Sequence, residues 1–262
     1  MSIASEITRL QGAKADIKTA IEAKGVTVPS SAKIDTYDTY VSQISGGGGT
    51  NYGPLVDRSI TSISSSELGN ITTIGYGAFY NCNSLTSITI PDSVTSIGDN
   101  AFRGCAVLQN ITIPNNVTSI GDGVFYNCQA FTNITIPNGV TSLGQQVFSR
   151  CTSLASITIP SSVTSLGPYI FDGCSSLTSV TVPNGVTIIN NYTCQSCSSL
   201  SSVSLPATIT KINNSAFKGT SSLTAIDFAG TIAQWNAITF GSNWKQNSAL
   251  TTIHCSDGDI TL

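Results

Sequence analysis

The sequence contains few charged residues. Its 262 residues include 11 lysines and arginines and 14 aspartates and glutamates, so about a tenth of the chain is charged, compared with roughly a quarter in a globular protein. The basic residues form no cluster, and the net charge is −3. Nucleic-acid binding requires positive charge concentrated on one face. The sequence therefore argues against a nucleic-acid-binding protein and predicts a neutral polar surface of Ser, Thr, Asn and Gly.

Histidine and long apolar runs are also scarce. His254 is the single histidine, which excludes zinc sites built on paired histidines and leaves one candidate for a histidine-assisted nucleophile. No apolar run approaches the roughly 18 residues of a membrane span. The first ten residues, MSIASEITRL, lack the basic end and apolar stretch of a secretory signal. We therefore expect no membrane span, no cofactor, no metal site and no enzymatic activity.

A repeat of 23 residues dominates the rest of the chain. Proline returns at this step without one slip, at Pro91, Pro114, Pro137, Pro160, Pro183 and Pro206. A structural column of cysteine keeps the same step, at Cys82, Cys105, Cys128, Cys151, Cys174 and Cys197. So does an aromatic column, at Phe79, Phe102, Phe125, Phe148, Phe171 and Phe217, with Cys194 between the last two. A fixed period of this length is typical of stacked repeat architectures.

The apolar positions of one unit predict its local structure. Ile88 and Ile90 alternate with polar residues, which is typical of a short strand. Pro91 ends that strand because it has no N–H for the ladder. Residues 94–97 read as a second short extended segment, and Gly98 turns the chain back towards the core. Because one unit cannot bury its own apolar edges, we expect the units to stack at about 4.8 Å into a parallel β-solenoid.

The unit resembles the leucine-rich repeats of the BspA-like family. That family's repeat has the form A-F-x-x-C-x-x-L-x-x-I-x-I-P, and residues 78–91, AFYNCNSLTSITIP, follow it. The resemblance covers roughly residues 55–262. It implies a leucine-rich-repeat solenoid, mostly parallel β-sheet with turns and short irregular or 3₁₀ segments, and a non-enzymatic surface or adhesive protein. It does not identify the ligand.

Both ends of the repeat depart from its period. Residues 75–229 hold the regular units. Residues 55–74 are expected to form an N-terminal cap rung, in which residues 60–63 lie 25 positions before their equivalents instead of 23. Residues 230–262 are expected to form a C-terminal cap, because an open apolar end needs a cover. The bulky residues of this cap are Trp235, Phe240, Trp244, Ile253 and Cys255.

The first 45 residues differ in composition from the repeats. Ten of the 25 charged residues lie between Glu6 and Asp38, and residues 46–54, with four consecutive glycines, read as a flexible linker. Lys24-Gly25 ends a first helix, and a second short helix follows near residues 34–44. This α-helical hairpin or coiled-coil segment has too little core to be stable alone. The expected oligomerisation residues lie at heptad spacing, at Ile3, Ile7, Leu10, Ile17 and Ile21.

Three roles are open for this helical segment. It self-associates into a dimer or trimer, docks onto another structural protein, or packs back on the first rung of the solenoid. The strings SEI-x-RL-x-x-AKADIK-x-AI at residues 5–21 and KGV-x-VP at residues 24–29 resemble the amino-terminal segment of tail and fibre-type structural proteins of bacteriophages of gut bacteria. That resemblance implies a homo-oligomer, or attachment to another virion protein through residues 1–45. It also implies a virion tail protein that is assembled in the host cytoplasm.

Cys194 and Cys197 match the C-x-x-C pattern of redox and zinc sites. Both fall on columns of the repeat, so we interpret them as structural. Cysteines on neighbouring rungs would lie about 4.8 Å apart, too far for good disulfide geometry. We expect buried free thiols that act as small apolar side chains. The string DGD at residues 257–259 reads as a turn and not as a calcium loop.

Two surfaces of the solenoid are candidates for ligand binding. The outward positions of the strands form ladders of Ser, Thr and Asn, which suit ice or sugars but more simply suit any exposed parallel strand. The second candidate is a rim, made of turn positions 77 and 80 and their equivalents in later units. It is variable in a chain whose other columns barely change, so we place specificity there, with neutral drift as the alternative. The candidate binding residues on the rim are Tyr80, Arg103, Tyr126, Tyr169, Asp172 and Tyr192.

Three functional hypotheses follow. The first is a phage tail-associated or fibre-type receptor-binding protein that recognises a bacterial surface polysaccharide or protein. The alternative is a bacterial cell-surface BspA-like adhesin, located outside the cell and binding host proteins. The least favoured is an enzyme that uses Cys194, Cys197 or His254, because the pattern places no orienting acid beside them.

Overall fold

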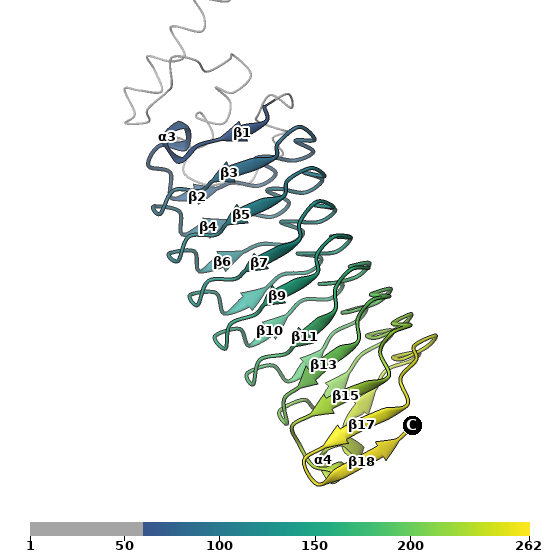
Figure 1. Ribbon diagram of the computed structural model, residues 1–262. Helices are drawn as coiled ribbons and strands as arrows, with labels where there is room; N and C mark the ends of the chain where they lie inside the picture. The colour runs from purple at the N-terminus through teal and green to yellow at the C-terminus, as the bar shows by residue number, and fades with distance from the viewer. Residues whose placement is uncertain (1–59) are drawn as a thin grey trace, which may run out of the picture.

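Residues 60–262 are the part of the chain described by the structure, a computed structural model (Figure 1). They wind into a solenoid whose rungs follow one another from the blue N-terminal end to the yellow C-terminal end of the picture. Each rung contributes one strand to a first row and one strand to a second row. The parallel β-solenoid expected from the repeat is thereby confirmed.

The two rows run along the solenoid on different sides of its core. The first row consists of β1 (Ser62–Ile63), β3 (Ser87–Thr89), β5 (Asn110–Thr112), β7 (Asn133–Thr135), β9 (Ser156–Thr158), β11 (Ser179–Thr181), β13 (Ser202–Leu205), β15 (Ala225–Phe228) and β17 (Thr252–Cys255). The second row consists of β2 (Thr73–Ile74), β4 (Ser96–Ile97), β6 (Ser119–Ile120), β8 (Ser142–Leu143), β10 (Ser165–Leu166), β12 (Ile188–Ile189), β14 (Lys211–Ile212) and β16 (Thr239–Phe240). Most neighbouring strands within a row pair in parallel, and the pairing is interrupted between β5 and β7, between β9 and β11, and between β10 and β12.

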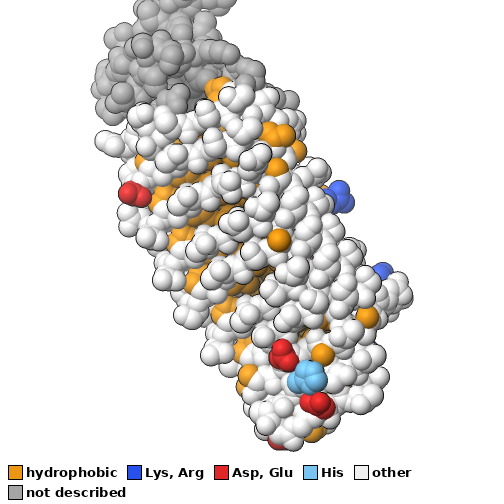
Figure 2. Space-filling model, in the orientation of Figure 1, with side chains coloured by type: hydrophobic (Ala, Val, Ile, Leu, Met, Phe, Trp, Pro, Cys, Tyr) orange, Lys and Arg blue, Asp and Glu red, His pale blue; other side chains and the backbone are white. Residues whose placement is uncertain are grey.

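The register of the first row confirms the period of 23. Ile88 pairs with Ile111, and Val180 pairs with Val203. Ile88 is buried while the residues on either side of it are exposed, as the alternation predicts. The Ser, Thr and Asn ladders therefore cover the outer face of this row. Figure 2 shows that face as mostly neutral polar and hydrophobic, with its charged side chains near the edges and the lower end.

The second extended segment is shorter than the sequence predicts. Residues 94–97 were expected to be extended, but β4 includes only Ser96–Ile97. The reason is a turn after the proline, in which the N–H of Val94 donates to the carbonyl oxygen of Pro91 at 3.0 Å. Val94 is fully buried inside this turn. Its side chain therefore packs in the core, while its backbone N–H forms a turn hydrogen bond and not a hydrogen bond to a neighbouring strand.

Turns form the third side of each rung, between the second and first rows. Their backbone N–H groups donate to carbonyl oxygens of the next rung, for example Phe79 to Ala101 at 2.7 Å. Two positions in each turn have positive φ. The first series is Gly77, Asn100, Gly123, Gln146, Tyr169, Tyr192 and Ser215, and the second is Asn81, Gly104, Asn127, Arg150, Gly173, Ser196 and Gly219. The rim is carried by a rigid, hydrogen-bonded part of each rung.

Asx side chains also link successive rungs at these turns. Asp99 Oδ1 accepts from the backbone N–H of Asp122 at 2.8 Å, and Asp122 Oδ1 accepts from that of Gln145 at 2.9 Å. The next residue in this column is Pro168, which has no N–H. Gln145 occupies the same column as Asp99 and Asp122. The residue one rung later offers no N–H, so an acceptor side chain is not needed at Gln145. These carboxylates have a structural role.

Stacked phenylalanine rings form the centre of the core. Adjacent rings from Phe79 to Phe171 have centroids 5.0, 5.6, 5.7 and 6.0 Å apart, with interplanar angles of 9 to 11°. This is the offset stacking that aromatic rings prefer. The series ends at Cys194, which occupies the next place in the column. Beyond it, Phe217 meets Trp244 edge-on at 6.4 Å.

The cysteine column does more than fill space. Its members are buried thiols, as expected. The thiol of Cys128 also donates to the carbonyl oxygen of Phe102 at 3.1 Å, and that of Cys151 donates to Phe125 at 3.1 Å. Cys105, Cys174 and Cys197 repeat the pattern one rung apart. The expectation of a purely apolar role was therefore incomplete, because each of these thiols also satisfies a buried carbonyl of the previous rung.

The N-terminal rung has the expected two-residue distortion. Ser62 pairs with Ser87, a step of 25, whereas Thr73 pairs with Ser96, a step of 23. A one-turn helix, α3 (Ser65–Leu68), lies between the two strands of this rung. Its Leu68 is buried against the core. The extra residues are therefore absorbed before the regular repeat begins.

The C-terminal segment is itself a longer rung followed by a covering strand. Ile226 pairs with Ile253 and Ile212 with Phe240, steps of 27 and 28 residues. The helix α4 (Ile232–Asn236) supplies the additional length, and its Trp235 is buried against aromatic neighbours. The last strand, β18 (Gly258–Thr261), runs antiparallel to β17. The turn expected at residues 257–259 lies at residues 256–257 instead, and Gly258, with φ 142°, already begins β18.

Several sequence predictions fall outside the described residues. They are the helical segment over residues 1–45, its apolar residues Ile3, Ile7, Leu10, Ile17 and Ile21, the linker 46–54 and residues 55–59 of the N-terminal cap. Within residues 60–262 there is no helix with the length and apolar character needed to cross a membrane.

Candidate ligand-binding rim

The six candidate rim residues all lie on the turn side of the solenoid and are half-buried. Hydrogen bonds between successive turns hold these side chains one rung apart; the N–H of Phe125, next to Tyr126, donates to the carbonyl oxygen of Val147 at 2.9 Å. The turns bring most of the candidates together in two groups. Tyr80 stands apart, because no ring contact or hydrogen bond joins its side chain to another of the described residues.

Tyr169 and Tyr192 form the first group. Their rings stack with centroids 4.4 Å apart and an interplanar angle of 14°. Both residues have left-handed backbone conformations, with φ of 59° and 58°. Glycine holds the equivalent place in two other rungs, at Gly77 and Gly123, and smaller polar residues hold it in the remaining three. A bulky residue in this conformation costs about 1–2 kcal/mol, so the pair is held in a conformation that glycine would adopt without strain.

Polar side chains border the tyrosine pair. Asp172 accepts from Gln195 Nε2 at 3.0 Å and from the Ser149 hydroxyl at 3.4 Å. Desolvation raises the pKa of Tyr169, and Tyr192 and Asp172 add to the increase. The Tyr169 hydroxyl therefore stays neutral at physiological pH. An aromatic surface with fixed amide, carboxylate and hydroxyl groups beside it can stack on one face of a ligand and hydrogen-bond its edge.

Arg103 and Tyr126 form the second group, together with a third residue that the sequence pattern did not single out. The guanidinium carbon of Arg103 lies 3.9 Å from the centroid of the Tyr126 ring, and that of Arg150 lies 5.7 Å from the same centroid. Arg103 also donates to Asn100 Oδ1 at 3.3 Å. Arg150 was missed because it belongs to the second positive-φ series. The sequence did contain a signal for Arg150, because an arginine is unusual in a column that holds Gly or Asn in most other rungs.

The C-x-x-C pair lies in the core and not at a surface site. Cys194 and Cys197 are both buried and free. A hydrogen bond with Cys197, followed by desolvation, raises the pKa of the Cys194 thiol well above its ordinary value. A protonated buried thiol is neither a good nucleophile nor a metal ligand. Across residues 60–262, no group of three His, Cys, Asp or Glu side chains is placed to hold a metal ion.

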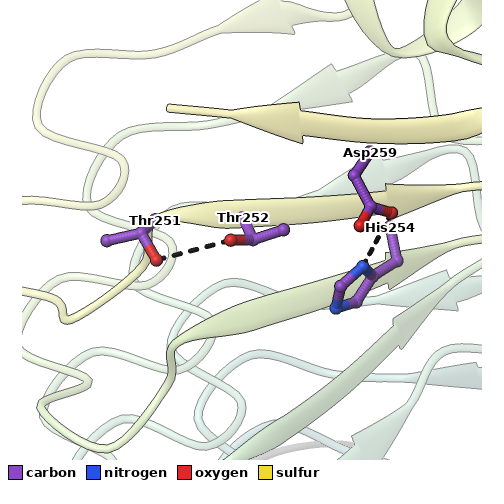
Figure 3. Close-up of polar contacts among 4 residues, drawn as sticks. All are labelled: Thr251, Thr252, His254 and Asp259. Carbon is purple, nitrogen blue, oxygen red and sulfur yellow. Dashed lines mark hydrogen bonds and ion pairs between the residues drawn. The ribbon is translucent and has the colours of Figure 1, made fainter.

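His254 takes part in a surface ion pair that joins the last two strands. Its Nδ1 lies 2.8 Å from Asp259 Oδ1, linking β17 to β18 (Figure 3). Thr251 and Thr252, drawn in the same view, hydrogen-bond each other at 3.5 Å. The hydrogen bond that His254 donates to Asp259, followed by the charges of Asp259 and Asp227, raises the pKa of His254. This ion pair links the two strands that close the cap.

We expect the His254 pair to make the cap pH-dependent. Because the folded pKa lies above the unfolded value, its stabilisation is complete below the unfolded pKa, about 6.5. It is lost as the pH rises through the folded pKa. In an NMR titration of the single histidine, Asp259→Asn should lower the His254 pKa. The difference in unfolding midpoint between wild type and Asp259→Asn should shrink from pH 5.5 to pH 8; a constant difference would contradict this role.

This architecture is similar to that of known leucine-rich repeat proteins. The family model described as BspA type leucine rich repeat region matches six copies, over residues 57–174 and 118–247. A crystal structure of a leucine-rich repeat protein from Bacteroides ovatus is 29% identical, with a TM-score of 0.64, and the match covers 76% of this chain and 56% of that chain. This chain therefore spans little more than half the length of that protein.

Two other solved structures are similar over comparable lengths. A leucine rich cell surface protein from Faecalibacterium prausnitzii is 29% identical, with a TM-score of 0.40, over 69% of this chain and 62% of that chain. The leucine-rich repeat protein of T. pallidum is 26% identical, with a TM-score of 0.43, over 67% of this chain and 72% of that chain. No curated protein sequence matches the chain.

Proposed function

The chain belongs to the family of BspA-type leucine-rich repeat proteins, and from that premise we propose that it is an adhesion protein of a bacterial cell surface that recognises its ligand through the rim. Solenoids of this kind are typical of non-enzymatic repeat proteins, and the family that matches is not a catalytic one. Members of the family are typically proteins of the bacterial surface. A stacked array of rungs offers a long, rigid surface for recognition.

The comparisons favour the cell-surface alternative over the phage hypothesis. The family match lies in the repeats, and the Bacteroides ovatus protein comes from a bacterium. The phage resemblance rests on residues 5–29, outside the described residues, and no comparison supports it. The virion location and the attachment through residues 1–45 are therefore not part of this proposal.

The single observation that carries the proposed binding surface is the conformation of Tyr169 and Tyr192. Strain in the backbone persists only where the surrounding structure imposes it, and it is concentrated at functional sites. Here two large aromatic side chains occupy positions suited to glycine and lie half-buried on the surface, one rung apart. Tyrosine combines apolar area, a polar tip and low conformational entropy, which makes it effective in recognition.

A double glycine variant tests the rim without removing a residue that the fold needs. In Tyr169→Gly/Tyr192→Gly, glycine adopts the positive φ freely, so the thermal midpoint should change little. Binding of the full chain to immobilised bacterial polysaccharides and host surface glycoproteins, measured by biolayer interferometry, should weaken at least about tenfold. Tyr76→Ser, which changes an exposed tyrosine outside the rim, is the control. Equal binding by all three proteins would place recognition elsewhere, with the outer face of the first row the next candidate.

A further inference from the structure

We propose that Arg103, Tyr126 and Arg150 form a binding site for the carboxylate groups of an acidic polysaccharide. This inference rests on the proposed function of the rim and specifies the chemistry of one part of it. The two guanidinium groups that converge on this ring belong to the only arginines among residues 60–262. They lie on different rungs, so the fold and not chain proximity brings them together.

The geometry places two positive charges close to each other. Arg103 and Arg150 lie 3.9 and 5.7 Å from one ring centroid, so their guanidinium carbons are no more than 9.6 Å apart, the sum of these distances. The π face of Tyr126 attracts each cation, and Asn100 Oδ1 holds Arg103 from the side. Both guanidinium groups are therefore oriented before a ligand arrives. A pre-oriented arginine loses less conformational entropy on binding.

Neither arginine has an acidic partner among residues 60–262. The one ion pair in this part of the chain joins His254 to Asp259, at the far end of the solenoid. Asp172 forms no ion pair with Arg150; the N–H of Arg150 donates to the Asp172 carbonyl oxygen at 2.7 Å. The Asp172 carboxylate is already hydrogen-bonded to Gln195 and Ser149. In a chain of net charge −3, two adjacent uncompensated guanidinium groups mark a local site for an anion.

The surroundings favour a polysaccharide over an acidic peptide. Peptide and protein interfaces bury apolar anchor residues at their centres. The large apolar side chains that residues 60–262 leave exposed are Tyr76, Val107, Ile188 and Leu262, and none of them lies on the rim. The rim offers amides, hydroxyls and tyrosine rings, which bind sugar hydroxyls and ring faces. Arginine pairs with carboxylate through two parallel hydrogen bonds.

The probe for this site is tetragalacturonate, an oligosaccharide with one carboxylate per sugar, and its fully methyl-esterified form is the neutral control. We expect the full chain to bind the acid, with an affinity that falls as salt concentration rises, and not to bind the ester. The double variant Arg103→Gln/Arg150→Gln should lower the affinity by about tenfold or more per arginine. Calorimetry at two salt concentrations measures both effects.

Two controls distinguish this site from a diffuse charge effect and from a peptide-binding site. Lys211→Gln/Lys245→Gln removes the same total charge away from the Tyr126 ring and should leave binding within about twofold. A tetraglutamate peptide tests the peptide alternative and should not bind. Equal loss in the arginine and lysine variants, equal binding of peptide and sugar, or no preference of the wild type for acid over ester would each overturn the proposal. If only Tyr169→Gly/Tyr192→Gly weakens binding to surface glycans, the rim function stands and the anion site does not.

Discussion

Phe125→Ala should lower the free energy of unfolding by about 3–5 kcal/mol, the range for a large aromatic residue removed from a packed core. Phe125 is fully buried and contacts three other rings, those of Phe102, Phe148 and Phe131, with centroids 5.6, 5.7 and 5.3 Å away. The alanine variant would lose the transfer free energy of the ring and these ring contacts. It would also leave a cavity that rungs fixed by backbone hydrogen bonds cannot close.

Urea unfolding followed by circular dichroism measures this loss. The matched control is Tyr80→Ala, the removal of a half-buried aromatic side chain that makes no ring contact with the described residues. It should cost less than about 1.5 kcal/mol, because little buried area is lost. Similar losses for both variants would mean that the phenylalanine stack is not the centre of the core.

Gly167→Ala should also destabilise the protein, by about 1–3 kcal/mol, through a close approach of two rungs. A Cβ on Gly167 would lie 2.4 Å from the carbonyl carbon of Gly144 and 2.5 Å from the nitrogen of Gln145. These are backbone atoms of the previous rung, so no side-chain rotation relieves the overlap. The rungs would have to separate, which would lengthen hydrogen bonds on both sides of the substitution.

Gly75→Ala is the control for that prediction, because it changes the same column where a Cβ would meet nothing within 4 Å. Its effect should be neutral or stabilising by up to about 1 kcal/mol, since alanine reduces the entropy of the unfolded chain. Differential scanning calorimetry of the two variants gives the comparison. Midpoints that fall equally would show that the column does not set the spacing between rungs.

The regular part of the fold could be predicted from the sequence because each unit repeats the same information. A strand as short as Ser87–Thr89 is a weak signal alone, but the same alternation at 23-residue intervals made its register and buried face clear. Val94 shows the limit of such patterns. Its column is apolar in every unit, yet only the hydrogen bond to Pro91 shows that its backbone forms a turn.

The less regular features could not be predicted in the same way. The step of 27 to 28 residues in the last rung depends on α4, which occurs once and is only five residues long. The thiol hydrogen bonds of the cysteine column depend on the direction of the Sγ atom, which spacing does not reveal. The sequence therefore predicted the buried position of the cysteine column but not the hydrogen bonds that its thiols donate.

The candidate site was predictable in position but not in pairing. Variability pointed to Tyr126 and Tyr169 on the rim, and both lie half-buried on the turn side. Which side chains meet across rungs depends on rotamers and on the backbone conformation of each turn. Arg150 lies in a column of mostly glycine and asparagine, residue types that indicate a turn backbone and not a binding side chain. A single arginine in such a column is the kind of exception that can mark a binding residue in repeats of this type.

The antiparallel strand β18 also covers the open end of the first row. A parallel ladder that ended at β17 would present unpaired N–H and C=O groups spaced to accept a strand from a second molecule, and such edges promote fibre growth. β18 occupies these groups in the opposite chain direction and carries exposed Asp259 on its outer surface. Parallel stacking of a second molecule is therefore disfavoured at this end, because the edge it would meet runs in the opposite direction and carries a charge.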